Sequence, residues 1–345
     1  MILNPFSIVM LLVASISTIL GLYGSILLLK VIVAGKRYPH TSKKHTGSET
    51  GTNRVISLAT AVLVLNLFSY PFFYATLQSF VKDIEGTMCI YGVTQVLPLL
   101  CRFLEVIKPL IFFFIGQWLI LHFLTRQNKT TGSLTSRKLK LLLGVSIGIV
   151  VESMGELIFF LSLPAGSHTP VTCCTSKIDS PERISAILSG YLLGHQYEQP
   201  LLLFYYLGNL FLLGMIGYFL RKRRWAIRGV LRRRSVGLAF SVSLINLFLT
   251  ALTVLEVIGP RLMNLPYHHC PYCLLQYVPD SSLMIGLFIL GTYGIGWAFG
   301  LAMIFRDKES ARNLSFYLDR LYRFSFCCFS LSLTMVSIHL LGSTM

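Results

Sequence analysis

Apolar residues along this chain come in eight long blocks that are separated by polar stretches. The blocks cover about residues 6–30, 55–81, 98–124, 141–163, 200–220, 236–258, 282–305 and 325–342. A helix needs about 20 predominantly apolar residues to cross the hydrocarbon core of a bilayer. The pattern therefore predicts an all-α integral membrane protein, a polytopic bundle of 7–8 transmembrane helices in a single domain over residues 1–345, with the last block the weakest.

Composition supports the membrane interpretation. Hydrophobic residues make up 54% of the chain and charged residues only 13%, whereas soluble domains carry about 25% charged residues. So little charge excludes an ordinary soluble protein. The first block is too long for the apolar core of a cleavable signal peptide, so we expect it to remain as an anchor.

The basic residues predict an orientation. The formal net charge is +16, and most Lys and Arg residues fall in four alternate connections at 35–54, 125–140, 221–234 and 306–323. Connections rich in Lys and Arg stay on the cytoplasmic side. The N-terminus is then outside, the localisation is the cytoplasmic or plasma membrane, and the basic runs face anionic lipid headgroups rather than nucleic acid.

The remaining connections hold most of the cysteines. On this topology five of the eight face the periplasm or the cell exterior, namely Cys89, Cys173, Cys174, Cys270 and Cys273. The last two lie in the stretch "YHHCPYC", directly after His268 and His269. We therefore expect these seven residues to form one outward Cys/His cluster.

Three kinds of chemistry remain open for this cluster. Extracytoplasmic cysteines form structural disulfides by default, and the sequence does not choose a pairing. Cys and His are also ligands of zinc and copper, which predicts either metal as cofactor. The sequence has no Cys-x-x-Cys-His run, and its intramembrane histidines are few and at opposite ends of the spans, so no haem is predicted.

The segment Cys270–Cys273, Cys-Pro-Tyr-Cys, resembles the active-site tetrapeptide of glutaredoxins. The resemblance covers these four residues only and implies dithiol–disulfide exchange, with no thioredoxin-like pattern around it. The first functional hypothesis is therefore a membrane protein that binds a soft metal or exchanges disulfides. It would serve electron transfer, or metal or thiol delivery, to an extracytoplasmic redox protein, metalloprotein or other membrane subunit.

Two alternatives belong to other classes of protein. The N-out layout, with Cys327 and Cys328 after an amphipathic segment, resembles the plan of G-protein-coupled receptors, but their Asp-Arg-Tyr and Asn-Pro-x-x-Tyr motifs are absent. The chain could then be a receptor-like bundle, or a non-catalytic subunit, whose outer cysteines only join loops.

The other alternative is a transporter, which rests on charged residues inside the predicted spans, Glu105, Lys108, Glu152 and Glu156. Glu152 and Glu156 are four residues apart and share a helix face. Because intramembrane charges are costly and usually paired, we favour an ion pair, Lys108 with Glu156 or Glu105 with a nearby donor, over a proton or cation relay.

Two short amphipathic surface helices are also predicted. One follows Ser180 as N-cap with Pro181 at its first position, and the other covers Leu314–Tyr322 on the cytoplasmic face. A last expectation is geometric. A sulfur of the Cys173–Cys174 pair should lie within roughly 8 Å of a sulfur or imidazole of another outer loop, preferably in His268–Cys273, because shared ligands lie close to their metal.

Overall fold

The computed structural model is built from helices, and it contains no strand within the residues it describes, which are 4–37, 46–126, 132–163, 174–222, 230–305 and 314–342. It separates into two compact units, Met1–Val171 and Thr172–Met345. We describe each unit by itself, and the single domain expected from the sequence stays a prediction.

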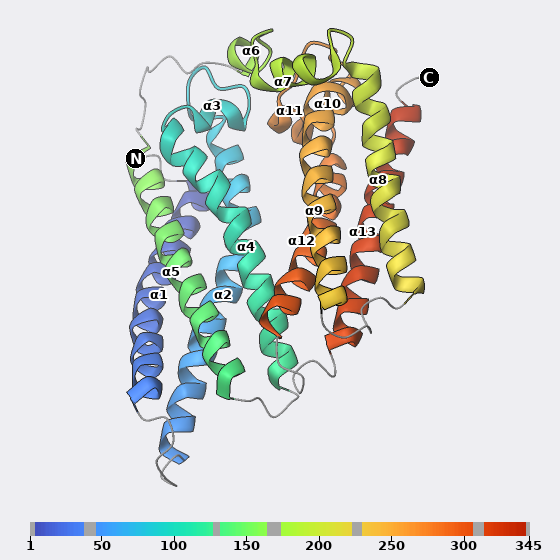
Figure 1. Cartoon of the computed structure of the whole chain (residues 1–345). Helices are drawn as coiled ribbons and strands as arrows, with labels where there is room; N and C mark the ends of the chain where they lie inside the picture. The colour runs from blue at the N-terminus through green and yellow to red at the C-terminus, as the bar shows by residue number, and fades with distance from the viewer. Residues whose placement is uncertain are drawn as a thin grey trace. The chain divides into compact units, whose positions relative to one another are not determined.

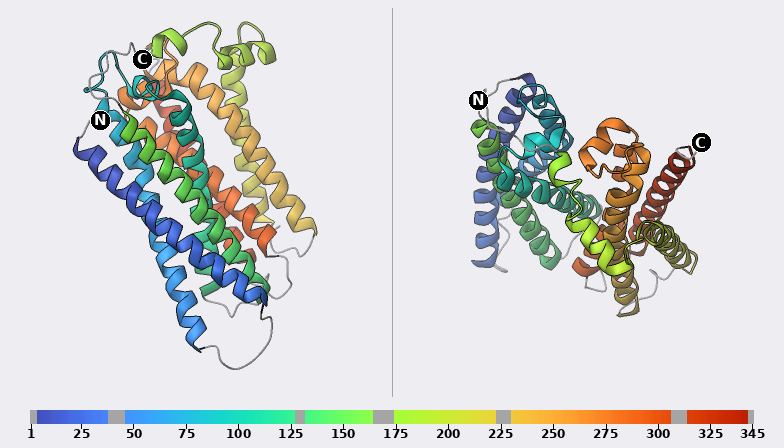
Figure 2. Two further views of the ribbon diagram at one scale, coloured as in Figure 1. Left: turned by 90° about the vertical axis from the view of Figure 1, so that its left-hand side faces the viewer. Right: turned by 90° about the horizontal axis from the view of Figure 1, so that it is seen from above.

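The first unit consists of four long helices and one short one. Its elements are α1 (Pro5–Arg37), α2 (Thr46–Phe80), α3 (Ile90–Thr94), α4 (Pro98–Arg126) and α5 (Gly132–Ser162). Helix α1 packs along α5 and α2, and α4 packs on α5, as the views in Figures 1 and 2 both show. Their shared core includes Leu63, Ile115, Trp118 and Leu142, all buried.

The second unit has four long helices with short helices gathered at one of their ends (Figure 1). Its elements are α6 (Cys174–Lys177), α7 (Ile184–Leu193), α8 (Glu198–Arg221), α9 (Val230–Thr253), η2 (Val254–Ile258), α10 (Gly259–Leu262), α11 (Pro271–Tyr277), α12 (Ser281–Ile304) and α13 (Leu314–Gly342). Helices α12 and α13 approach closely, since a Cβ on Gly294 would lie 2.2 Å from Ser325 Oγ. Small residues allow such close packing of membrane helices.

The structure confirms the multi-pass membrane character at the level of helix length and composition. Within the described residues, seven helices are long and apolar enough to cross a membrane. They are Pro5–Val33, Arg54–Phe80, Ser136–Ser162, Glu198–Arg221, Arg234–Leu262, Ser281–Ile304 and Leu314–Gly342. The weakest predicted span is therefore among them, whereas α4, which carries Arg102, Glu105 and Lys108, is not.

Both predicted surface helices need correction. Helix α7 begins at Ile184 with Arg183 as N-cap, while Ser180 and Pro181 lie in the preceding turn. Leu314–Tyr322 is not a separate helix, because α13 runs without a break to Gly342. Leu314, Leu318 and Tyr322 are buried, so their apolar stripe packs inside the protein rather than on a lipid surface.

Candidate metal centre

The short helix α11 brings two thiols to one side of the chain. Cys270 is its N-cap, Pro271 occupies the first helical position and Cys273 follows within the first turn. Proline suits that position because its missing N–H would have no partner in the helix. Residues three apart face the same way on a helix, so the Cys-x-x-Cys spacing directs both sulfurs toward one point.

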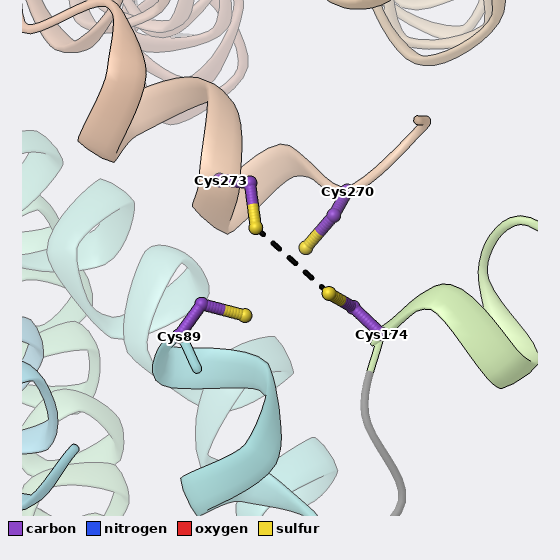
Figure 3. Close-up of side chains that lie close together, drawn as sticks. All are labelled: Cys89, Cys174, Cys270 and Cys273. Carbon is purple, nitrogen blue, oxygen red and sulfur yellow. Dashed lines mark hydrogen bonds between the residues drawn. The ribbon is translucent and has the colours of Figure 1, made fainter. Parts of the chain in front are cut away.

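A third thiol comes from the start of α6. Cys174 Sγ lies 3.9 Å from Cys273 Sγ, and the sulfurs of Cys174, Cys270 and Cys273 all lie within 4.8 Å of one another. Figure 3 shows these three side chains pointing toward one another from α6 and α11. A disulfide has sulfurs about 2.05 Å apart, so Cys174 and Cys273 are not bonded. The separation instead matches two thiolates on one ion with metal–sulfur bonds of about 2.3 Å.

His268 lies beside this sulfur group with its ring held by a carboxylate. Its Nδ1 is 2.7 Å from Asp179 Oδ2, and its Nε2 is 4.0 Å from Cys174 Sγ. An ionised carboxylate only accepts hydrogen bonds, so Nδ1 donates to Asp179, and in the neutral ring the lone pair is then on Nε2, on the sulfur side. Metal-binding histidines are commonly oriented by a carboxylate in this way.

Asp179 also fixes the chain next to that ring. Its second oxygen, Oδ1, accepts a hydrogen bond from the His269 backbone N–H at 2.9 Å. The one carboxylate therefore ties the segment after α6 to the residues just before α11. Both segments supply thiols to the sulfur group, so Asp179 sets their spacing.

A buried ion pair anchors the same region to the long helices. Arg183 contacts both carboxylate oxygens of Glu256 in η2, with Nε at 2.9 Å from Oε1 and Nη2 at 2.6 Å from Oε2. Tyr197 donates its hydroxyl to Glu256 Oε2 at 2.9 Å. Burial, followed by this hydrogen bond, raises the pKa of Tyr197 to about 12. The hydrogen bonds with Glu256 raise the pKa of Arg183, which stays charged.

The other residues of the predicted cluster are carried by other elements. His269 is directed toward η2, with Nδ1 at 3.1 Å from the Leu255 carbonyl oxygen. Cys89 is the N-cap of α3 in the first unit, and Cys173 lies outside the described residues. No disulfide joins any two of the described cysteines. The expected proximity of Cys174 to the His268–Cys273 segment is present, and any bridge to Cys173 stays a prediction.

The charged residues predicted inside the membrane form a separate group in the first unit. Lys108 Nζ contacts both Glu152 Oε1, at 2.7 Å, and Glu156 Oε1. The expected ion pair is therefore present, and it includes both glutamates. Glu105 lies one turn before Lys108 and accepts a weak hydrogen bond from the Cys101 thiol at 3.9 Å.

Sequence reasoning missed the carboxylates that organise the second unit. Glu256 was visible as an acidic residue inside the apolar block 236–258, and Arg183 as one of few basic residues outside the basic connections. Those two signals could have suggested a pair. Asp179 has no such signal, because an aspartate in a polar connection is ordinary. The chain matches no protein-family model, no curated protein and no solved structure.

Proposed function

We propose that this integral membrane protein binds one soft transition metal ion in its second unit, through Cys174, Cys270, Cys273 and His268. The proposal rests on the position of the Cys174 sulfur, which lies 3.9 Å from Cys273 Sγ and 4.0 Å from His268 Nε2. Ligands at these separations can share one ion after small side-chain adjustments. Three thiolates and one imidazole are a common ligand set for zinc.

The identity of the metal decides what the site does. Zinc has no redox chemistry, so a zinc ion would fasten the α6–α7 segment to α11 or be passed on to a partner. Copper also accepts thiolate and imidazole ligands and could transfer electrons. We propose zinc first because the ligand set suits it, with delivery to, or electron transfer with, an extracytoplasmic protein as the wider role.

Chain direction supports placing this site on the extracytoplasmic side. Helix α8 leaves the end where α7 and α11 lie and finishes at Arg221, beside the basic connection 221–234. Helix α12 ends at Ile304 and α13 begins at Leu314, both at the end of the unit where α8 finishes (Figure 1), and the basic residues of 306–323 follow Ile304 in the sequence. Basic connections stay in the cytoplasm, so the thiols would lie on the other side.

Elemental analysis of the purified full-length chain tests the proposal. We expect about one zinc per chain, a value reduced by at least half in C174S, C270S and C273S. The control is C328S, which removes a buried thiol of α13 from the same unit and should retain the metal. Copper in place of zinc would assign the redox role. A metal-free protein that also fails to bind added zinc or copper(I) would reject the site.

Dithiol exchange is a second candidate, favoured by the position of Cys270 ahead of Pro271 at the start of α11. In that role the Cys270 and Cys273 thiols would be oxidised to a disulfide while a partner disulfide is reduced to a dithiol, and the reverse reaction would restore them. Equilibration with glutathione buffers, followed by acid trapping and alkylation, would show a reversible two-thiol change lost in C270S. A thiol count that does not change across the buffers would exclude exchange.

A further inference from the structure

The group formed by Lys108, Glu152 and Glu156 in the first unit is closed off from solvent. Lys108 lies on α4, and the two glutamates lie one turn apart on α5. Lys108 and Glu152 are each 1% exposed, and Glu156 is 0% exposed. All three side chains lie within the part of the helices that is expected to cross the membrane, so water does not screen their charges.

Lysine has three donors, and all have a partner here. Two are accounted for by Glu152 Oε1 and Glu156 Oε1. The ammonium also lies 4.6 Å from the centre of the Phe73 ring, contributed by α2. A cation over an aromatic face at this distance is stabilised. These contacts hold Lys108 as a charged ammonium and leave it no donor for the second oxygens of the two glutamates.

The two carboxylates are only half satisfied. Glu152 Oε2 and Glu156 Oε2 are buried and have no hydrogen-bond partner among the described residues. Each glutamate thus binds Lys108 through one oxygen and leaves the other without a donor. A buried carboxylate oxygen without a donor is strongly unfavourable, so a proton bound at one of these second oxygens would be stabilising.

Counting charges identifies what is missing. With both glutamates ionised, one ammonium faces two carboxylates, and the group carries a net charge of about −1 in a low-dielectric interior. Two carboxylates that share a site do not both ionise readily. One bound proton would bring the group to neutrality and turn an unsatisfied acceptor into a hydroxyl.

Neighbouring helices supply no second cation in the described residues. Tyr70 on α2 is a titratable neighbour of Lys108 and Glu152, and beside it lie Tyr74 on α2 and then Glu105 and Cys101 on α4. None of these four carries a positive charge in any protonation state. No described neighbour of the triad therefore supplies the compensating charge.

We propose that Glu152 and Glu156, bridged by Lys108, form a proton-binding site in the membrane, in which the two carboxyl groups share one proton taken from water. The binding step is the protonation of one carboxylate to a carboxylic acid, with no change in oxidation state. The site is independent of the metal centre in the second unit. It is the kind of intramembrane acid that proton relays use.

Infrared spectroscopy of the full-length protein in detergent tests the proposal. At pH 7 we expect a carbonyl band of a protonated carboxyl group that shifts in D2O and shifts further when the glutamates are labelled with carbon-13. The labelling assigns the band to glutamate without any substitution, so the test does not depend on a variant that folds. Absence of the band in wild-type protein would overturn the proposal.

Substitutions then locate the proton. E152Q and E156Q each leave one carboxylate for one ammonium, so the band should disappear in both. E105Q is the matched control, since Glu105 is half-buried on the same helix as Lys108 and accepts a hydrogen bond from the Cys101 thiol, and it should retain the band. A band that persists in E152Q and E156Q would place the proton elsewhere. A missing wild-type band together with a melting temperature that rises with sodium concentration would assign the site to an alkali cation instead.

Discussion

At the scale of single residues, Asp179 is the side chain that gives the metal centre its geometry. It accepts one hydrogen bond from the His268 ring and another from the His269 backbone, each on a different oxygen. Asparagine has only one acceptor oxygen, so D179N must lose one of the two bonds. Carboxylates that orient metal ligands are worth about 10–100-fold in affinity, and we expect D179N to weaken zinc binding by about that factor.

Competition with a chromophoric chelator measures this change in affinity. The control is E182Q, which alters an exposed carboxylate three residues away and should bind zinc as the wild-type protein does. If D179N and E182Q bound zinc equally well, Asp179 would have no part in orienting His268. A residue other than His268 would then be the fourth zinc ligand.

At the scale of elements, the segment carrying α6 and α7 is fastened to η2 by Arg183. Its guanidinium contacts Glu256, whose side chain is fully buried. Removing one partner of a buried pair leaves an uncompensated charge and costs about 3–5 kcal/mol. We therefore expect R183M to lower the free energy of unfolding by about that amount and to loosen the α6 thiol.

Thermal unfolding in detergent, followed by circular dichroism, checks this prediction. R261M is the matched control, because Arg261 and Glu198 form a pair with side chains 42% and 66% exposed. Exposed pairs contribute about 0–1 kcal/mol. The double variant R183M/E256M removes both charges and should recover much of the loss. Equal effects of R183M and R261M would mean that the Glu256 pair does not hold the segment.

The long helices could be predicted from the sequence. The residues at which they end, and the contacts between the short elements, could not be predicted as well. Blocks of about 20 apolar residues indicate spans because a bilayer admits little else. The block from 325 was expected as a separate weak span, yet α13 begins at Leu314. Charged side chains between Leu314 and Tyr322 obscured a stripe that is buried against the unit.

Much of the candidate site could be predicted, and the missing part has a physical cause. Cys174, His268, Cys270 and Cys273 were expected together because soft ligands on one membrane face are unusual. Asp179 and the bond between Arg183 and Glu256 depend on how distant segments meet, since the two partners of that pair are 73 positions apart in the sequence. Local spacing carries no information about such contacts.

At the scale of the whole molecule, charge is expected to fix the direction of every span. Helix α8 connects two exposed residues, His195 just before it and Lys222 just after it. Lys222 belongs to a run of basic residues that begins at Arg221 and should remain in the cytoplasm. If α8 crosses the membrane, His195 and the thiol-bearing segments of its unit lie outside.

Cysteine labelling in intact cells tests this orientation. A membrane-impermeant maleimide should label H195C above the wild-type background in intact cells, and it should label K222C only after permeabilisation. These two positions flank the same helix, so each serves as the control for the other. The reverse pattern would place the Cys174, Cys270 and Cys273 thiols in the cytoplasm and remove the basis for an extracytoplasmic partner. Labelling of both variants in intact cells would mean that α8 does not cross the membrane, although Glu198–Arg221 is long and apolar enough to do so.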